Sequence, residues 1–153
     1  MSEKIIWWGG QLPEAETMTA VGTGSMSGHL GIEFTDVRPG SVTARMPVNE
    51  RTQQPYGRLH GGASVALAET IASVAAAFTV DRSKSAVVGL EINANHVRPG
   101  FAGYVYATAT PENLGRTTQI WSIRITDEAG KLVCISRFTA MVIPADRGSQ
   151  QSG

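Results

Sequence analysis

The stretch QPYGRLHGGASVALAETIASVAAAFTV, residues 54–80, decides the fold of this chain. It opens with turn residues, passes through His60-Gly61-Gly62, and then continues apolar and rich in alanine, without Gly or Pro, to Val80. This composition predicts one helix that begins near Gly61. Because apolar residues occur on every side of that helix, we expect it to be buried.

Glu69 is the unusual residue of the predicted helix. Between Arg58 and Asp81 only His60 and Glu69 can titrate, and no Lys or Arg lies within one helical turn of the carboxylate. Burying an unpaired charge is costly, so a carboxylate in the middle of a buried helix indicates chemistry, although such a group can also be structural. Glu69 is therefore the first candidate for a catalytic residue.

Composition limits the classes of function. The 153 residues fit one domain, and acidic and basic residues balance at 13 each without a run of like charge, which argues against a nucleic-acid partner. The N-terminal apolar run is too short for a signal peptide, and no stretch approaches the roughly 20 apolar residues of a membrane span. We therefore expect a cytoplasmic protein without a membrane partner.

Cysteine and histidine usage argues against a metal site. Cys134 is the only cysteine, which excludes an internal disulfide and favours a small buried side chain in a strand. His29, His60 and His96 have no metal-ligand spacing to one another or to a carboxylate. We expect no metal.

The remaining sequence predicts an α+β fold in which an antiparallel sheet curls around the single long helix. A short helix is expected at 11–20 and a flexible Gly/Ser turn at 22–28. Alternating apolar residues predict a first pair of strands at 32–37 and 42–48 and four more after the helix, with Trp121, Ile123 and Ile125 on one buried face. The four later strands are expected at 86–97, 103–110, 117–126 and 132–143, with a turn at Asn113-Leu114-Gly115. The expected organisation is an N-terminal extension (1–28), one domain (29–144) and a disordered tail (145–153).

The glycines before the helix suggest a site that polarises a carbonyl group. A helix N-terminus presents unpaired N–H groups with partial positive charge, and glycine at Gly61 lets a ligand carbonyl approach the backbone. Ser73, one turn beyond Glu69, can hydrogen-bond the carboxylate or hold a water. Simpler interpretations stay open, because a Gly-Gly pair is common in plain turns and His60 can be a capping residue.

Spacing along the helix separates these two groups. Gly61 and Glu69 are eight residues apart, or roughly 12 Å along one helix, whereas a reacting carbonyl carbon must lie about 3 to 3.5 Å from its attacking atom. Two helices running antiparallel across a two-fold axis would place Gly61 of one chain opposite Glu69 of the other. If both residues take part, the enzyme must be at least a dimer.

The chain also resembles the hot-dog-fold acyl-CoA thioesterases, in the branch that contains the Arthrobacter 4-hydroxybenzoyl-CoA thioesterase, the proofreading thioesterase of enterobactin synthesis and 1,4-dihydroxy-2-naphthoyl-CoA hydrolase. The resemblance covers residues 29–143. The segments that carry it are MPVNERTQQPYGRLHGGASVALAETIASVA, VVGLEINANHVRPG, NLGRTTQIW and DEAGKLVCISR. It implies a hot-dog domain that acts on an acyl-CoA thioester, in which coenzyme A is part of the substrate and no cofactor is needed. It also implies a homo-oligomer, typically a tetramer built from two dimers.

By the same resemblance, Glu69 is the catalytic nucleophile or the general base for water, and the Gly61 N–H polarises the thioester oxygen. Gln54 and His60 help to orient the oxygen or the leaving thiolate, and Ser73 positions the attacking water. Further positions match contacts to the substrate and coenzyme A; they are Gly89, His96, Val97, Arg98, Pro99, Asn113, Leu114, Gly115, Arg116, Thr117 and Thr118. Arg98 and Arg116 are also expected near glycine turns at strand ends, where guanidinium groups can bind phosphates.

Rival functions remain at this point. A hydratase or dehydratase of acyl thioesters fits less well, because its catalytic His and acidic residue stand in other motifs. A non-catalytic acyl-CoA-binding module would have no use for Glu69 with Ser73 and Gln54. The apolar candidates for the acyl pocket, which are Ile71, Val74, Phe78, Val88 and Tyr56, suit an aromatic or a medium aliphatic acyl group equally. An aroyl group is favoured by the relatives alone, and an acyl-carrier-protein thioester stays possible.

Overall fold

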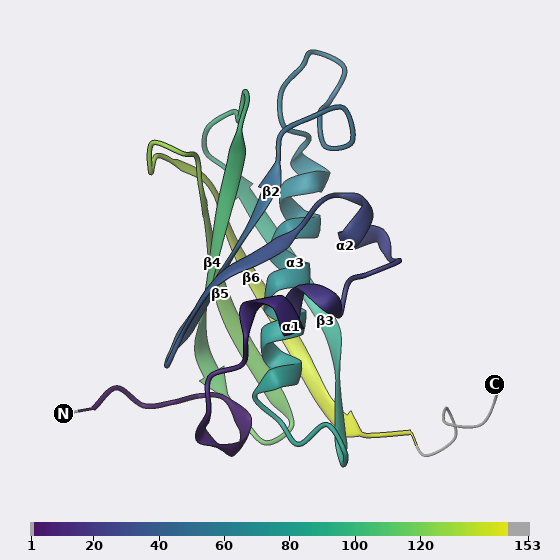
Figure 1. Cartoon of the computed structure of the whole chain (residues 1–153), viewed down its shortest axis with the longest axis vertical. Coiled ribbons are helices and arrows are strands. Elements are labelled where there is room, and N and C mark those ends of the chain that lie inside the picture. Colours follow the sequence, from purple (N-terminus) through teal and green to yellow (C-terminus); the bar gives the residue numbers. More distant parts are fainter. Residues whose placement is uncertain (1, 147–153) are drawn as a thin grey trace.

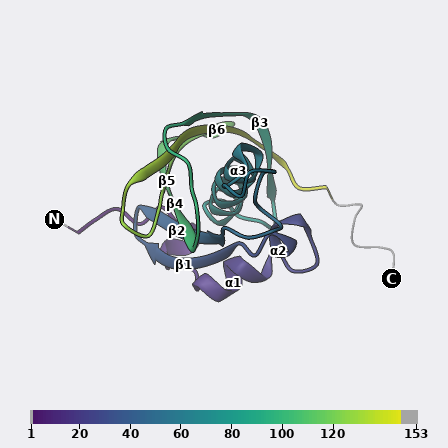
Figure 2. The same cartoon turned by 90° about the horizontal axis from the view of Figure 1, so that it is seen from above.

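A computed structural model describes residues 2–146. Its centre is one helix, α3, wrapped by a six-stranded antiparallel sheet with the strand order β1-β2-β4-β5-β6-β3 (Figure 1). Viewed from above, the sheet curves around α3, while α1 and α2 lie beside β1 (Figure 2). The strands are β1 (Glu33–Arg38), β2 (Ser41–Pro47), β3 (Ser85–His96), β4 (Tyr104–Leu114), β5 (Thr118–Thr126) and β6 (Leu132–Pro144). The helices are η1 (Trp8–Gly10), α1 (Ala15–Ala20), α2 (Met26–His29) and α3 (Gly61–Phe78). The predicted α+β architecture is confirmed.

The inner face of the sheet forms the core with α3. Trp121, Ile123 and Ile125 of β5 are fully buried, as their alternation predicted. On α3 the small residues Ala68 and Ala72 are also fully buried. Alanine at these positions lets the helix lie close to the concave sheet without leaving voids.

Burial of α3 is one-sided, which corrects the prediction of a helix buried on every side. The fully or nearly buried residues form one stripe, which comprises Ala63, Ser64, Leu67, Ala68, Ile71, Ala72, Ala75 and Ala76. On the opposite side, Glu69 and Ser73 are only half-buried. Among residues 2–146, α3 is the one helix that is long and apolar enough to span a membrane. This is weak evidence of a membrane span, because the central helix of a curled sheet meets the same criteria.

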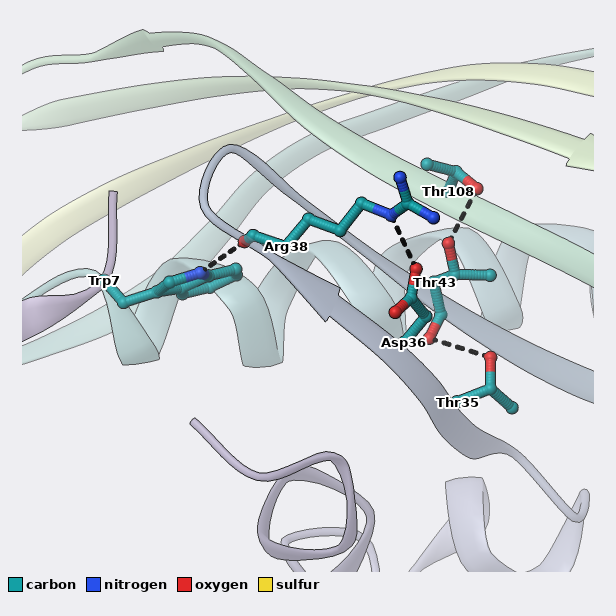
Figure 3. A network of polar contacts seen from close by, with 6 residues as sticks. All are labelled: Trp7, Thr35, Asp36, Arg38, Thr43 and Thr108. Atoms are coloured by element: carbon teal, nitrogen blue, oxygen red, sulfur yellow. Dashed lines mark hydrogen bonds and ion pairs between the residues drawn. The ribbon is translucent and has the colours of Figure 1, made fainter. Parts of the chain in front are cut away.

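The N-terminal segment packs onto the domain. Trp7 is 3% exposed and Met18 is fully buried. The Trp7 indole Nε1 donates to the Arg38 carbonyl oxygen at 2.7 Å, beside the ion pair between Arg38 Nε and Asp36 Oδ2 at 2.7 Å (Figure 3). The Thr19 hydroxyl accepts from the Phe34 N–H at 2.8 Å. The extension is thus held against β1 and its turn.

Three predicted boundaries change. Residues 22–28 are not merely a loop, because α2 begins at Met26 and the Ser25 hydroxyl donates to the Gly22 carbonyl at 2.6 Å. The helix expected at 11–20 begins only at Ala15. β4 continues past Pro111 to Leu114, where a register shift against β5 absorbs the proline, so Asn113 and Leu114 belong to the strand rather than to a turn.

Two smaller predictions concern the end of the chain. Cys134 is a fully buried residue of β6, as predicted. The tail predicted at 145–153 falls outside the described residues from position 147 onward.

Candidate active site

One candidate half of the site lies at the N-terminus of α3. His60 caps the helix, since its Nδ1 accepts from the Gly62 N–H at 2.8 Å. Gly61 packs directly under the His96 ring, and a Cβ added at Gly61 would lie 3.0 Å from His96 Nε2. Only glycine fits this contact without displacing the imidazole. His60 therefore has the capping role that the sequence had left open.

A cavity of about 380 Å³ opens at this helix end. The predicted residues Gln54, His96, Val97, Arg98 and Pro99 all line it together with Gly61. The cavity thus gathers the helix N-terminus and the predicted coenzyme A contacts that follow β3. We call it the Gly61 cavity.

Backbone contacts fix the walls of the Gly61 cavity. Thr52 is 1% exposed, and its hydroxyl donates to the Pro47 carbonyl at 2.7 Å while its own carbonyl accepts from the His60 N–H at 2.8 Å. The Gln54 side-chain oxygen accepts from the Tyr56 N–H. The connection into α3 is therefore an ordered turn, and its hydrogen bonds set where Gln54 and His60 lie.

The second half surrounds Glu69. A cavity of about 290 Å³ holds Glu69 and Ser73 on one face of α3, as the four-residue spacing predicted. Five apolar side chains contribute to its wall, namely those of Met18, Val21, Ile32, Phe34 and Val74. We call it the Glu69 cavity. Its lining combines one carboxylate and a few hydroxyls with a predominantly apolar surface.

Gly89 of β3 lies beside the carboxylate. A Cβ added there would lie 3.0 Å from Glu69 Oε1 and 3.1 Å from Cε2 of Phe138. The absence of a side chain at Gly89 therefore leaves room for the carboxylate between the helix and the sheet. This places the predicted substrate contact Gly89 with Glu69 rather than with Gly61.

The two cavities share no lining residue. Within one protomer, Gly61 and Glu69 therefore face different spaces, as their separation along the helix required. No group of three or more His, Cys, Asp or Glu residues able to hold a metal ion occurs among residues 2–146.

The predicted contacts at 113–118 lie elsewhere in the protomer. The Gln119 side chain donates to the hydroxyl of Thr79, the C-cap of α3, at 2.9 Å. The neighbouring β4–β5 turn is thus at the C-terminal end of a helix that is about 27 Å long, whereas Arg98 is at its N-terminal end. One protomer does not bring Arg116 and Arg98 together.

Sequence reasoning missed several lining residues. Met18, Ser25 and Ser27 belong to the predicted N-terminal extension, yet they line the Glu69 cavity. Arg58 and the buried Ser64 line the Gly61 cavity.

Of the predicted acyl-pocket residues, Val74 lines the Glu69 cavity, but Ile71 is fully buried in the core and Phe78 lines a separate hollow near Trp7. Tyr56 is 86% exposed. Val88 is 41% exposed on the edge strand β3.

The arrangement can be compared with known proteins. A sequence profile of the Thioesterase superfamily matches residues 56–134, just over half of the chain. The 1,4-dihydroxy-2-naphthoyl-CoA hydrolase of Escherichia coli is 48% identical over 84% of this chain and 93% of its own length. The chain belongs to the thioesterase superfamily.

Further similarities support the family and the fold. The proofreading thioesterase EntH of Cronobacter turicensis is 45% identical over 91% of this chain and 99% of its own length. The solved structure of a mutant thioesterase from Pseudomonas aeruginosa, 46% identical, matches with a TM-score of 0.88 and covers 92% of this chain and 99% of that chain. The predicted resemblance and hot-dog fold are confirmed, and the protein is a thioester hydrolase.

Proposed function

We propose that this hydrolase cleaves an aromatic acyl-CoA thioester, of the hydroxybenzoyl or dihydroxynaphthoyl kind, into the free acid and coenzyme A in the cytoplasm. One observation carries the proposal: the helix N-terminus at Gly61 and the carboxylate of Glu69 occupy separate cavities of one protomer. Each cavity holds half of the chemistry that thioester hydrolysis needs. A dimer with antiparallel α3 helices would join them into two equivalent sites.

In this mechanism the carbonyl oxygen of the thioester accepts a hydrogen bond from the Gly61 N–H. Negative charge that develops on the oxygen is stabilised by that N–H and by the positive helix N-terminus. Gln54 and His60 help to orient the oxygen or the leaving thiolate. The supporting observation is that Gln54 lines the same cavity as Gly61 and that His60 caps the same helix.

Glu69 of the partner protomer acts on the carbonyl carbon. As a nucleophile, its carboxylate forms an anhydride while the C–S bond breaks and coenzyme A leaves as the thiolate; water then hydrolyses the anhydride and regenerates the carboxylate. As a general base, Glu69 takes a proton from a water that attacks the same carbon; the C–S bond then breaks, and the proton passes from Glu69 to the departing coenzyme A thiolate. Ser73 positions that water from one turn further along the same face.

The acyl group is proposed to occupy the Glu69 cavity. Its apolar walls and volume of about 290 Å³ suit a planar ring, and the similar E. coli enzyme is named for an aromatic acyl-CoA. Hydroxyls of Thr19, Ser25 and Thr70 also line the cavity, and they offer hydrogen bonds to ring hydroxyl groups. This observation favours a hydroxylated aroyl group over a medium-chain aliphatic one.

The edge of the sheet supports the dimer. β3 is an edge strand, and Val88 and Leu90 on it are 41% and 54% exposed. Exposed apolar edge strands readily pair with another chain. Pairing of β3 with the partner's β3 would run the two α3 helices antiparallel and bring Gly89 and Glu69 to the interface. Two such dimers would form the tetramer that the family resemblance implies.

Mixing two inactive variants tests the shared site. Gly61→Val removes the carbonyl-binding half and Glu69→Gln removes the carboxylate half. Refolding them together in equal amounts should restore about a quarter of wild-type turnover, because half of the dimers are mixed and each mixed dimer has one intact site of two. A mixture of Glu69→Gln with Glu69→Ala, which damages the same half, should recover nothing.

The outcomes separate the alternatives. Turnover is followed as thiol release from benzoyl-CoA, its hydroxylated analogues and a panel of aliphatic acyl-CoAs. No recovery in the first mixture would contradict the shared site. If refolded wild type releases no thiol but binds acyl-CoA, the chain is a binding module, and preference for an aliphatic ester or an acyl-carrier-protein thioester would replace the aromatic assignment.

A further inference from the structure

A third cavity, of about 270 Å³, lies between the N-terminal segment and the C-terminal end of α3 (Figure 1). We call it the Trp8 hollow, and its lining comprises Trp7, Trp8, Gln11, Leu12, Pro13, Phe78, Val80 and Arg82. It shares no lining residue with the Gly61 cavity or the Glu69 cavity. Phe78 follows Glu69 by nine residues, or about 14 Å along α3. The hollow is therefore separate from both halves of the proposed active site.

Two successive indole rings contribute to the hollow in different ways. The Trp7 ring is almost fully buried, and its hydrogen bond to the Arg38 carbonyl oxygen holds it in place. Trp8 is 60% exposed, and the chain then turns at Gly9 and Gly10, whose φ angles of 75° and 72° favour glycine. One indole is thus anchored in the protein, and the next is open to a ligand.

Arg82 supplies a positive charge to the hollow. Its guanidinium carbon lies 4.3 Å from the centre of the Phe78 ring, and a guanidinium stacked in this way can still bind a carboxylate through its N–H edge. The ion pairs found within residues 2–146 do not include Arg82. The neighbouring carboxylate of Asp81 faces Lys84 instead, with Oδ2 3.9 Å from Nζ. Among the described residues, Arg82 therefore has a ring partner but no anionic partner.

Arg45 shows what the arrangement at Arg82 lacks. The Arg45 guanidinium also stacks on a ring, that of Tyr104 at 4.3 Å, and it is paired with Glu33 Oε2 at 3.0 Å. The Trp8 hollow has the stacked guanidinium without the carboxylate, and it adds apolar ring surfaces and a volume that suits a small planar ligand. A carboxylate attached to an aromatic ring would satisfy both the charge and the rings.

We propose that the Trp8 hollow is a binding site for a small aromatic carboxylate, outside the active site. The carboxylate pairs with Arg82, and the ring lies against the exposed indole of Trp8. The acid released by the proposed reaction belongs to this chemical class, so the choice of a naphthoate as the probe rests on the proposed function. The site itself is argued only from the groups that line it.

The indole N–H signal of Trp8 in the NMR spectrum of the isotope-labelled full-length protein reports the occupant. The chain has three tryptophans, and Trp8→Phe assigns the signal of Trp8. Adding 2-naphthoate should move this signal saturably and leave that of Trp121, which is fully buried in the core, in place. Two other probes, 2-naphthamide with the same rings but no charge and octanoate with the charge but no ring, should each bind about tenfold more weakly.

Three variants identify the groups that bind. Arg82→Gln should lower the affinity for 2-naphthoate about tenfold and remove the preference over 2-naphthamide. Trp8→Ala, in which the Trp7 signal reports binding, should lower the affinity about fivefold. Lys84→Gln is the matched control, because Lys84 is an exposed cation of the same turn as Arg82 but lines none of the three cavities. It should keep the affinity within about twofold.

Three results would contradict the proposal. If 2-naphthoate does not move the Trp8 signal, the hollow is not a site for this class of ligand. If the signal moves with the same affinity in Arg82→Gln, the change is transmitted from naphthoate bound elsewhere, and the proposal is overturned. Equal affinity of wild type for 2-naphthoate and 2-naphthamide overturns the assignment to a carboxylate.

Failure of the proposed function gives a different result. Thiol release from benzoyl-CoA should stay within about twofold of wild type in Arg82→Gln and Trp8→Ala, because both residues lie outside the two halves of the active site. A tenfold loss of turnover in Arg82→Gln would make the hollow part of the active site and overturn the proposal. Wild type that releases no thiol contradicts the proposed function, whereas the titration of the Trp8 signal still decides the hollow.

Discussion

The Gly61 cavity and the Glu69 cavity are built on opposite principles although one helix serves both. The first is made by backbone N–H groups and arginines, with His96 held against Gly61. The second is mostly apolar and contains one carboxylate. The first attracts negative charge and the second supplies it, so under the proposed function each cavity needs the other to complete an active site.

Glu69→Gln should have the largest effect. The amide keeps the shape of the side chain but cannot attack or accept a proton, so kcat should fall about a thousandfold or more. Thiol release measures it, and thermal melting checks that the fold persists. Glu112→Gln, at an exposed position of β4 outside both cavities, is the matched control and should keep wild-type turnover. Equal activity of the two variants would remove the carboxylate from the mechanism.

Gly61→Ala should be the next most severe change. The added Cβ would lie 3.0 Å from His96 Nε2 and 3.2 Å from Cε1, so the helix N-terminus or the ring must move by a few tenths of an ångström. We expect kcat to fall about tenfold to hundredfold, since the carbonyl contact depends on that alignment.

A double-mutant cycle tests the physical cause of that loss. If crowding against the ring is responsible, Gly61→Ala combined with His96→Ala should lose less activity than the product of the two single losses. Simple multiplication of the losses would show that the methyl group acts on the substrate rather than through His96.

Gly89→Ala should have a smaller effect, on the carboxylate side only. Its Cβ would lie 3.0 Å from Glu69 Oε1, and because the carboxylate is at the end of a flexible side chain it can turn aside. We expect kcat to fall about tenfold with little change in KM, and Gly89→Val to lose more. In the mixing experiment Gly89→Ala should complement Gly61→Val and fail to complement Glu69→Gln. Complementation of Glu69→Gln instead would place Gly89 in the other half.

The division between the cavities was partly predictable from the sequence. Local patterns were sufficient for α3 and for the buried face of β5, because alternation and helical spacing are short-range signals. The eight-residue gap between Gly61 and Glu69 predicts that two chains share the site if both residues take part. The contribution of Met18 to the Glu69 cavity could not be predicted, since it depends on contacts such as that of Thr19 with Phe34, 15 residues away. Pro111 within β4 was also beyond local rules, because the register shift that tolerates it depends on the partner strand.

Substitution of Cys134 should have the smallest effect on activity. Cys134 pairs with His96 in the sheet and follows Val133, which lines the Gly61 cavity, so a thiol nucleophile there would contradict the division. Burial raises the pKa of the Cys134 thiol, and the protonated thiol is a poor nucleophile. Cys134→Ala should therefore keep turnover within about twofold, and thiol reagents at neutral pH should label wild type only after unfolding.

The same raised pKa gives a pH dependence. In the unfolded chain the thiol ionises near its ordinary value of about 8.5, while in the folded chain it stays protonated to higher pH. Below about pH 8.5 both states keep the proton and the contribution of Cys134 to stability is constant; above it, the unfolded state loses the proton first and stability falls. Wild type should therefore lose more melting temperature than Cys134→Ala between pH 8 and pH 10. The opposite result would be rapid labelling of the folded enzyme at neutral pH, with activity lost both on labelling and in Cys134→Ala. The nucleophile would then lie in the Gly61 cavity, and the chemistry would not be divided between the two cavities.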